Sequence, residues 1–208
     1  MDDGVKNKEI SEKLRVRTFG GLSFYHQGGL ISIIWESQKA RHLFCYLLVT
    51  RDQWVHSDKL IGMLWPGCAG KDGMNNFKTT LSRLRKSFSG PLVINPVITN
   101  GDVFRINTDA VEIDAGQFRQ IALEGVKLLA RGETKSARQC LEAAQDLYTG
   151  EFIPEEPGNS FINNERRELA DLYFSVIRYL GEIYREEGNP QALDAFLFLN
   201  KMALSNIA

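Results

Sequence analysis

The chain has 208 residues, 43% of them apolar, which suffices for one large domain or two small domains with buried cores. No stretch approaches about 18 consecutive apolar residues, and the polar N-terminus lacks an apolar signal-peptide segment, so we expect neither a membrane span nor secretion. The three cysteines are scattered and form no C-x-x-C pair, as is usual in a reducing compartment. We therefore expect a cytoplasmic protein.

The net charge of −1 conceals two halves of opposite sign. Residues 14–107 carry 12 Lys and Arg against 5 Asp and Glu, a balance of +7, whereas residues 108–208 carry 10 against 17, a balance of −7. This asymmetry predicts two domains with different partners. The basic half can associate with phosphates, whereas the acidic half would be repelled by them.

In chain order, residues 1–13 are expected to form a disordered tail or a linker from something longer. Residues 14–35 have the alternation of polar and apolar positions that is typical of short strands. Two glycine pairs, at 20–21 and 28–29, divide this stretch into three strand segments, at 15–19, 22–25 and 30–35. We expect a small antiparallel sheet.

Three helices are predicted between residues 37 and 88, each starting at a residue whose side chain can cap a helix N-terminus. These caps are Ser37, Ser57 and Asp72. The first helix is expected to end near residues 51–52, and Pro66-Gly67 stops the second.

A β-hairpin is predicted after the third helix. Apolar residues at 97–98 and 103–106 flank Asn100-Gly101, and Asn-Gly between apolar runs is typical of a two-residue type I′ turn. Strands, three helices and a closing hairpin together describe a winged helix-turn-helix.

The third helix carries the strongest functional signal. One apolar stripe is formed by Phe77, Leu81, Leu84 and Phe88. The remaining surface is expected to carry basic, amide and hydroxyl groups, namely Asn75, Asn76, Lys78, Thr79, Thr80, Ser82, Arg83, Arg85 and Lys86. Such a face suits the DNA major groove. An ordinary solvated basic face is the alternative, but the hairpin and the +7 balance favour DNA.

From Asp114 onward the pattern is helical, with a loop that contains Pro154 and Pro157 between helices. Two helices are expected before this loop, one ending at Gly132 and the next at Tyr148. Two more are expected after it, over 161–187 and 191–204. The glycine-led spacing after Gly132 recurs after Gly188, and Leu180-Gly181-x-x-Tyr184 matches the core of the tetratricopeptide pattern. Since such repeats need stacked neighbours, we expect the chain to be a fragment of a longer protein.

Several runs resemble the OmpR-like winged-helix domain joined to a bacterial transcriptional activator domain, the arrangement of SARP-type regulators. They are KARHLFCYLL, VHSDKLIGMLWP, NNFKTTLSRLRKSF, VFRIN, VEIDAGQF and YTGEFIPE. The resemblance covers about Leu14 to the C-terminus. It implies an α+β winged helix with a four-stranded N-terminal sheet over 14–108, followed by an all-α, tetratricopeptide-like activator domain over 109–208. It also implies transcriptional activation through double-stranded promoter repeats, self-association on DNA and contact with RNA polymerase.

By this resemblance Lys78, Thr79 and Arg83 would face bases. Backbone phosphates would be contacted from α-helical and wing positions, namely Trp65, Asn75, Asn76, Ser82, Arg85, Thr99, Asn100 and Arg105. A packed core position is an equally good assignment for Trp65. Trp35 and Trp54 are assigned to packing or to the junction between the sheet and the helices. We expect Arg83→Ala to relax sequence preference, and Arg85→Ala to lower the salt dependence of binding.

Two residues depart from the pattern of related regulators. Asn75 stands where response-regulator relatives often carry Arg, which predicts fewer phosphate contacts. Asp102 at the predicted wing tip would repel a phosphate channel, so the wing would position the protein weakly rather than read bases.

No catalytic or metal site is predicted, because the three histidines lack partner spacing and no nucleotide-binding glycine loop is present. We expect neither an enzyme nor a cofactor. Glu155-Glu156 is expected to be a solvated turn and Arg166-Arg167 a solvated helix face. The rival hypothesis is a protein-interaction scaffold in which the winged helix reads no sequence.

Overall fold

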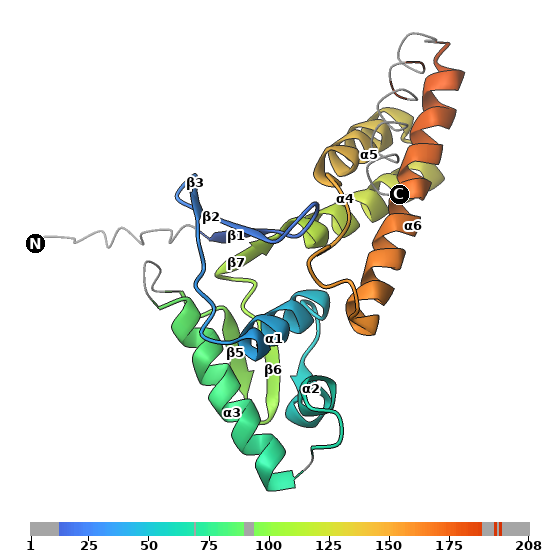
Figure 1. Cartoon of the computed structure of the whole chain (residues 1–208). Coiled ribbons are helices and arrows are strands. Elements are labelled where there is room, and N and C mark those ends of the chain that lie inside the picture. Colours follow the sequence, from blue (N-terminus) through green and yellow to red (C-terminus); the bar gives the residue numbers. More distant parts are fainter. Residues whose placement is uncertain (1–12, 69, 90–93, 189–193, 195, 197–208) are drawn as a thin grey trace, which may run out of the picture.

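The computed structural model describes residues 13–68, 70–89, 94–188, 194 and 196, and it forms a winged-helix half and a helical half (Figure 1). The predicted tail at 1–13 lies outside this range except for Lys13, and the predicted helix 191–204 lies outside it except for Asp194 and Phe196.

Two small sheets frame the winged-helix half. The first has the strand order β3-β2-β1-β7, and β1 pairs antiparallel with β2 and parallel with β7. Its strands are β1 (Leu14–Arg17), β2 (Ser23–His26), β3 (Gly29–Ile31) and β7 (Val111–Ile113). The predicted division at 108–109 therefore falls just before a strand of the N-terminal sheet.

The second sheet has the order β4-β6-β5. Its strands are β4 (Val55–His56), β5 (Val97–Asn100) and β6 (Val103–Ile106). The last two form the wing hairpin. Between the sheets pack α1 (Gln38–Val49), α2 (Ser57–Leu64) and α3 (Gly70–Ser87).

The strand predicted at 30–35 is too long, because β3 ends at Ile31. Trp35 instead packs its ring against Phe44 and Phe88, with centroid distances of 5.6 and 5.7 Å. Packing the tryptophan ring against two other rings stabilises the fold more than extending an exposed edge strand would. The packing role predicted for Trp35 is thus confirmed.

The helix starts are only partly as predicted. Ser37 does cap α1, accepting from the backbone N–H of Ala40 at 3.2 Å. Ser57, however, is the first residue of α2, and the cap is His56, whose Nδ1 accepts from the N–H of Asp58 at 3.3 Å. Asp72 lies in the first turn of α3, which starts at Gly70, where it still complements the helix dipole.

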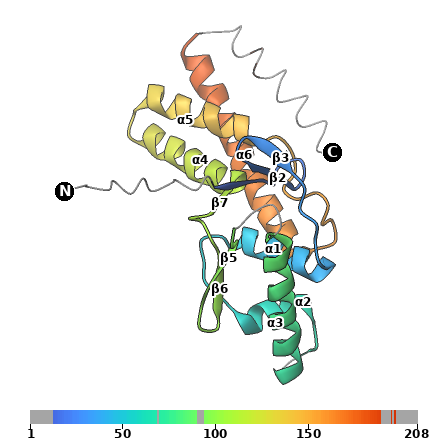
Figure 2. The ribbon, with the colours of Figure 1, turned by 90° about the vertical axis from the view of Figure 1, so that its left-hand side faces the viewer.

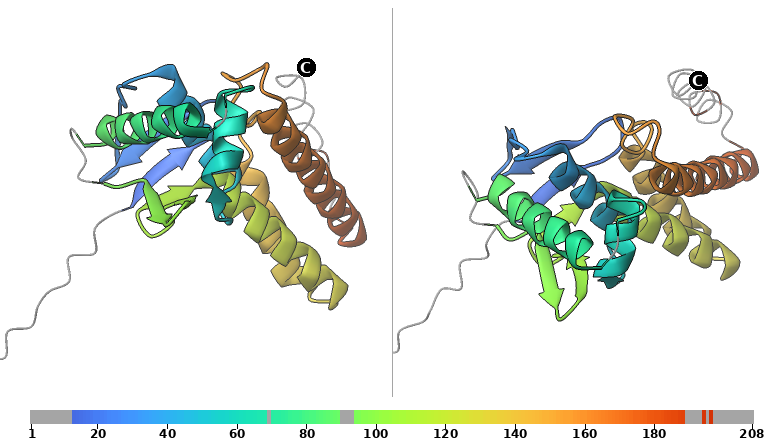
Figure 3. Two further views of the ribbon diagram at one scale, coloured as in Figure 1. Left: turned by 90° about the horizontal axis from the view of Figure 1, so that it is seen from below. Right: turned by 60° about the horizontal axis from the view of Figure 1, so that its bottom comes forward.

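The helical half contains α4 (Asp114–Ala130), α5 (Thr134–Leu147) and α6 (Ser160–Glu186). Figures 2 and 3 show these helices extending together away from the winged-helix half. Gly125 allows α4 and α5 to approach closely, because a Cβ there would lie 2.8 Å from Cδ2 of Leu141. An alanine at this position would require the Leu141 side chain or α5 itself to shift.

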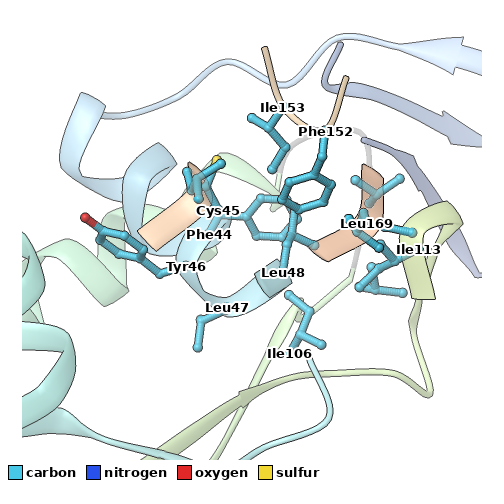
Figure 4. Packing of buried hydrophobic residues seen from close by; sticks show 14 of the residues in the cluster. Phe44, Cys45, Tyr46, Leu47, Leu48, Ile106, Ile113, Phe152, Ile153 and Leu169 are labelled. Atoms are coloured by element: carbon cyan, nitrogen blue, oxygen red, sulfur yellow. The ribbon is translucent and has the colours of Figure 1, made fainter. Parts of the chain in front are cut away.

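One hydrophobic core joins the halves (Figure 4). Phe44 and Leu48 of α1 pack in the same buried cluster as Ile113, Phe152 and Leu169. The loop after α5 also forms a β-bridge from Phe152 to Phe19. The two halves therefore share apolar surface that neither could bury alone.

Buried polar contacts add to this junction. The Glu165 carboxylate of α6 binds Arg51 and Arg119, each at 3.0 Å. Asp114 accepts hydrogen bonds from the backbone N–H groups of Thr18 and Phe19, and from the Thr18 hydroxyl at 2.5 Å. These groups order the junction because a buried charge without partners would be costly.

Two predictions of solvated charge are wrong at this junction. Glu156 is buried and pairs with Arg41 and His42 of α1, at 3.6 and 3.4 Å. Arg166 is half-buried and donates to the backbone carbonyls of Phe152 and Ile153. The sequence could not show this. The partners of Glu156 are more than 100 residues away in the chain, and those of Arg166 are backbone carbonyls.

Candidate nucleic-acid interface

The recognition-helix candidate α3 is anchored as its apolar stripe predicts. Phe77, Leu81, Leu84 and Phe88 are all buried, and the Phe77 ring packs against Phe104 of the wing at a centroid distance of 4.8 Å. At the start of α3, a Cβ on Gly73 would lie 2.8 Å from Ile61 Cγ2. Close packing on α2 and the wing therefore fixes which face of α3 is exposed.

The exposed face carries the residues predicted to meet DNA. Lys78, Thr79 and Arg83 are exposed, and so are Asn75, Asn76 and Ser82. Thr80 is not, since only 4% of its surface is accessible, so its predicted place on this face is wrong. The face is therefore narrower than the sequence suggested, with its polar groups on neighbouring turns of one side.

Two further basic residues flank this face. Lys71 is exposed in the first turn of α3, and the sequence prediction missed it because it placed the helix start at Asp72. Lys86 is exposed near the C-terminus but pairs with Glu36 at 3.0 Å. Within the described residues, the exposed cations of α3 that form no ion pair are thus Lys71, Lys78 and Arg83.

Arg85 does not point outward as predicted. It is half-buried and its Nη2 donates to Thr99 Oγ1 at 2.8 Å and to the Val97 carbonyl at 3.4 Å. Both acceptors belong to β5. Arg85 therefore connects the recognition-helix candidate to the wing, and Thr99, although exposed, has its hydroxyl engaged in the same contact.

The wing turn is shifted by one residue from its predicted position. Asn100 pairs with Val103 inside the ladder, so the two-residue loop is Gly101-Asp102. The backbone φ angle of Gly101 is +59°, whereas that of Asp102 is negative. Glycine alone in the first central position is typical of a type II′ turn rather than type I′. Asn100 and Asp102 are both exposed at this tip.

The remaining wing candidate, Arg105, is half-buried and lies over the ring of Trp54, with its Cζ 4.9 Å from the centroid. Trp54 is itself 43% exposed, so it is a surface platform rather than a core residue. This stacking restricts the guanidinium to the side of the wing next to β4.

Trp65 follows α2 and is half-buried. Lys39 lies beside it, with Nζ 5.8 Å from the ring centroid and bonded to the Leu64 carbonyl at 2.5 Å. The sequence did not single out Lys39, because its place beside Trp65 depends on the packing of α1 on α2. The two side chains lie together at the C-terminal end of α2.

The described part of the chain holds no group of three or more His, Cys, Asp or Glu side chains arranged for a metal ion. Among the same residues, no helix is long and apolar enough to cross a membrane. The chemistry available on this face is hydrogen bonding and charge.

Comparison with known proteins gives two positive findings. Residues 113–197 match the family model described as bacterial transcriptional activator domain. The fold resembles a structure of Mycobacterium tuberculosis EmbR in complex with a low affinity phosphopeptide, with a TM-score of 0.73 and 20% identity. That match covers 92% of this chain and 50% of the EmbR chain, so this chain spans half the length of that protein. The search of curated proteins found no match.

Proposed function

We propose that the chain regulates transcription by binding specific DNA sequences. Its winged-helix half, followed by a region that matches the bacterial transcriptional activator domain, resembles the SARP-type arrangement. The family model that matches residues 113–197 describes a domain of transcriptional activators. The observation that carries the DNA-binding proposal is the exposed polar and basic side of α3, opposite its buried phenylalanine and leucine stripe. Such a helix can lie in a major groove while its apolar side stays in the core.

In the proposed complex Lys78, Thr79 and Arg83 face bases. Within the part of the chain that the structure describes, the exposed Arg83 side chain forms no ion pair, and a free guanidinium can bind guanine O6 and N7 together. Thr79 donates its hydroxyl to the Asn75 carbonyl at 3.0 Å, which leaves its methyl group and hydroxyl lone pairs for base edges.

Backbone phosphates would be contacted by residues around this helix, with Lys71 and Lys39 added to those predicted from sequence. The proposed set is Lys39, Trp65, Lys71, Asn75, Asn76, Ser82, Asn100 and Arg105. Arg85 and Thr99 act in this proposal by holding the wing against α3, because they bond to each other. Asp102 at the exposed wing tip favours a wing that positions the protein without entering a groove deeply.

The helical half is proposed to contact RNA polymerase and to support self-association on promoter repeats. Its junction with the winged helix is built from a shared core and buried ion pairs, so DNA binding by one half would fix the orientation of the other.

A selection of bound sequences from a random duplex pool tests this function. The proposal expects an enriched motif, with a repeat spacing that reports how many copies bind, and an affinity that falls steeply with salt. A lack of any mobility shift on DNA at low salt would favour the rival, a protein-interaction scaffold with a non-reading winged helix.

A further inference from the structure

The outer face of the N-terminal sheet carries a basic row that has no part in the proposed DNA contact. Lys13, Arg15 and Arg17 occupy alternate positions on and just before β1, and all three are exposed. Their neighbours Leu14 and Val16 are buried on the opposite face. Alternation along the strand thus separates an apolar inner face from a basic outer face.

This row forms one side of a concave site of about 510 Å³. Tyr25 of β2 and the Gln27-Gly28 turn line a second side, and Gln117 of α4 and Leu147 of α5 line a third. The site therefore lies where the sheet meets the helical half, and a ligand in it would contact both halves at once.

The charge of the site is positive. Its three cations face two carboxylates. Glu112 pairs with Arg15 at 3.5 Å and accepts from Gln117, whereas Asp114 is buried and accepts from Thr18. Arg17 lies over the Tyr25 ring, with Cζ 5.8 Å from the centroid. Lys13 donates to the Thr108 carbonyl at 3.0 Å but keeps two further N–H donors.

We propose that this sheet face binds an acidic segment of a partner protein in an extended conformation. Alternate side chains on a strand are about 6.6–6.8 Å apart, and an extended peptide repeats its own side chains at the same interval. Carboxylates at every second position of the partner would therefore match Lys13, Arg15 and Arg17 in register. Leu147 and the Tyr25 ring offer apolar contact to the intervening side chains.

A peptide fits this site better than a duplex does. The basic row shares its hollow with the Gln27-Gly28 turn and with Gln117 of α4, and a single extended chain can contact all of them. In Figures 1 and 2 the sheet lies at the other end of the winged-helix half from α2 and the first turns of α3. This surface goes beyond the proposed function and does not depend on base reading by α3.

The test uses the full chain and two synthetic eight-residue probes that carry a fluorophore, one alternating Glu and Thr and the other alternating Gln and Thr. Fluorescence anisotropy at low salt is expected to show binding of the Glu probe and at least about fivefold weaker binding of the Gln probe. Arg15→Ser with Arg17→Ser should weaken binding of the Glu probe by about five- to tenfold, as expected for the loss of two exposed ion pairs.

Lys78→Ser with Arg83→Ser is the matched control, since it removes two exposed cations from the other basic surface. It should leave binding of the Glu probe unchanged, and amide chemical-shift changes in the parent should fall on residues 13–17 and 23–28. Circular dichroism confirms folding of both double variants.

Equal binding of the two probes, or an effect confined to the Lys78 and Arg83 variant, overturns the proposal. So does a loss of DNA binding in the Arg15 and Arg17 variant without a change in peptide binding, because the face would then be a nucleic-acid surface. Failure of the peptide test leaves the DNA selection unaffected, so the two proposals fail separately.

Discussion

Arg85 in α3 donates a hydrogen bond to Thr99 in the wing, with Nη2 and Oγ1 2.8 Å apart. The same nitrogen also approaches the Val97 carbonyl at 3.4 Å. Because one side chain bridges the helix and the strand, the recognition-helix candidate and the wing are expected to move as a unit. We therefore propose that Arg85 holds the wing against α3, in place of the phosphate contact that the sequence suggested for it.

Thr99→Val should therefore weaken DNA binding without changing sequence preference. The substitution removes the acceptor of the 2.8 Å bond at nearly constant volume, and a hydrogen bond of this kind contributes about 1 kcal/mol net. A double-mutant cycle with Arg85→Met, read by DNA affinity and by urea unfolding, should show a coupling of about 1 kcal/mol. If the two substitutions changed DNA affinity independently, and only Arg85→Met lowered the salt dependence of binding, Arg85 would instead contact a phosphate.

Glu165→Ala should destabilise the junction between the halves strongly. Glu165 is 8% exposed and neutralises Arg51, which is 4% exposed. Its loss leaves this buried guanidinium with only the exposed Asp52, 3.7 Å away, as an ionic partner, at a cost of about 3 kcal/mol. The free energy of unfolding in urea measures this. Glu168→Ala is the control, because the Glu168 carboxylate also binds Arg119 but is largely exposed and should cost less than about 1 kcal/mol.

Asp114→Ala should destabilise the fold by about 3 kcal/mol, because it removes an acceptor for buried N–H and hydroxyl groups at the end of β1. Thr18→Val removes only the hydroxyl partner and should cost about half as much. Thermal unfolding of both variants decides the point, and equal melting temperatures in parent and Asp114→Ala would show that the contact contributes nothing.

Stability should fall as the pH rises above 9. Burial raises the pKa of the Cys45 thiol to about 12, and burial also raises the pKa of the Tyr148 and Tyr184 hydroxyls to about 12. In the unfolded chain these groups ionise near their ordinary values of 9.0 and 10.0, so between pH 9 and 12 the unfolded state holds fewer protons and gains population.

Urea midpoints at pH 8 and pH 10.5 measure this loss. In Tyr184→Phe the decrease between the two pH values should be smaller than in the parent, because one of the three groups no longer titrates. Stability that is constant or rises over this interval would contradict the assigned pKa directions.

The sequence predicted the architecture because its signals are local. The stripe from Phe77 to Phe88 defined α3 and its buried side, and the N-cap at Ser37 defined the start of α1. The tetratricopeptide-like pattern correctly indicated a helical second half, which α4, α5 and α6 form.

What the sequence could not predict depends on contacts between distant residues. Arg85 looked like a surface cation until β5 was placed beside α3, and Glu156 looked solvated until α1 was placed beside the proline loop. The wing turn differed because strand pairing moved Asn100 into the ladder and left Gly101 to adopt the positive φ. Tertiary packing decided each of these cases over local preference.

The central claim is that the exposed side of α3 reads DNA, and Arg83 tests it most directly. The measurement is the affinity of parent and Arg83→Ala for the duplex selected from a random pool and for variants of it with single base-pair changes, at several salt concentrations. We expect Arg83→Ala to lose about 1–3 kcal/mol of discrimination at one base pair. The slope of its log binding constant against log salt concentration should change by about one or less. A parent that binds every duplex equally, or an Arg83→Ala protein with the full discrimination of the parent, would contradict it.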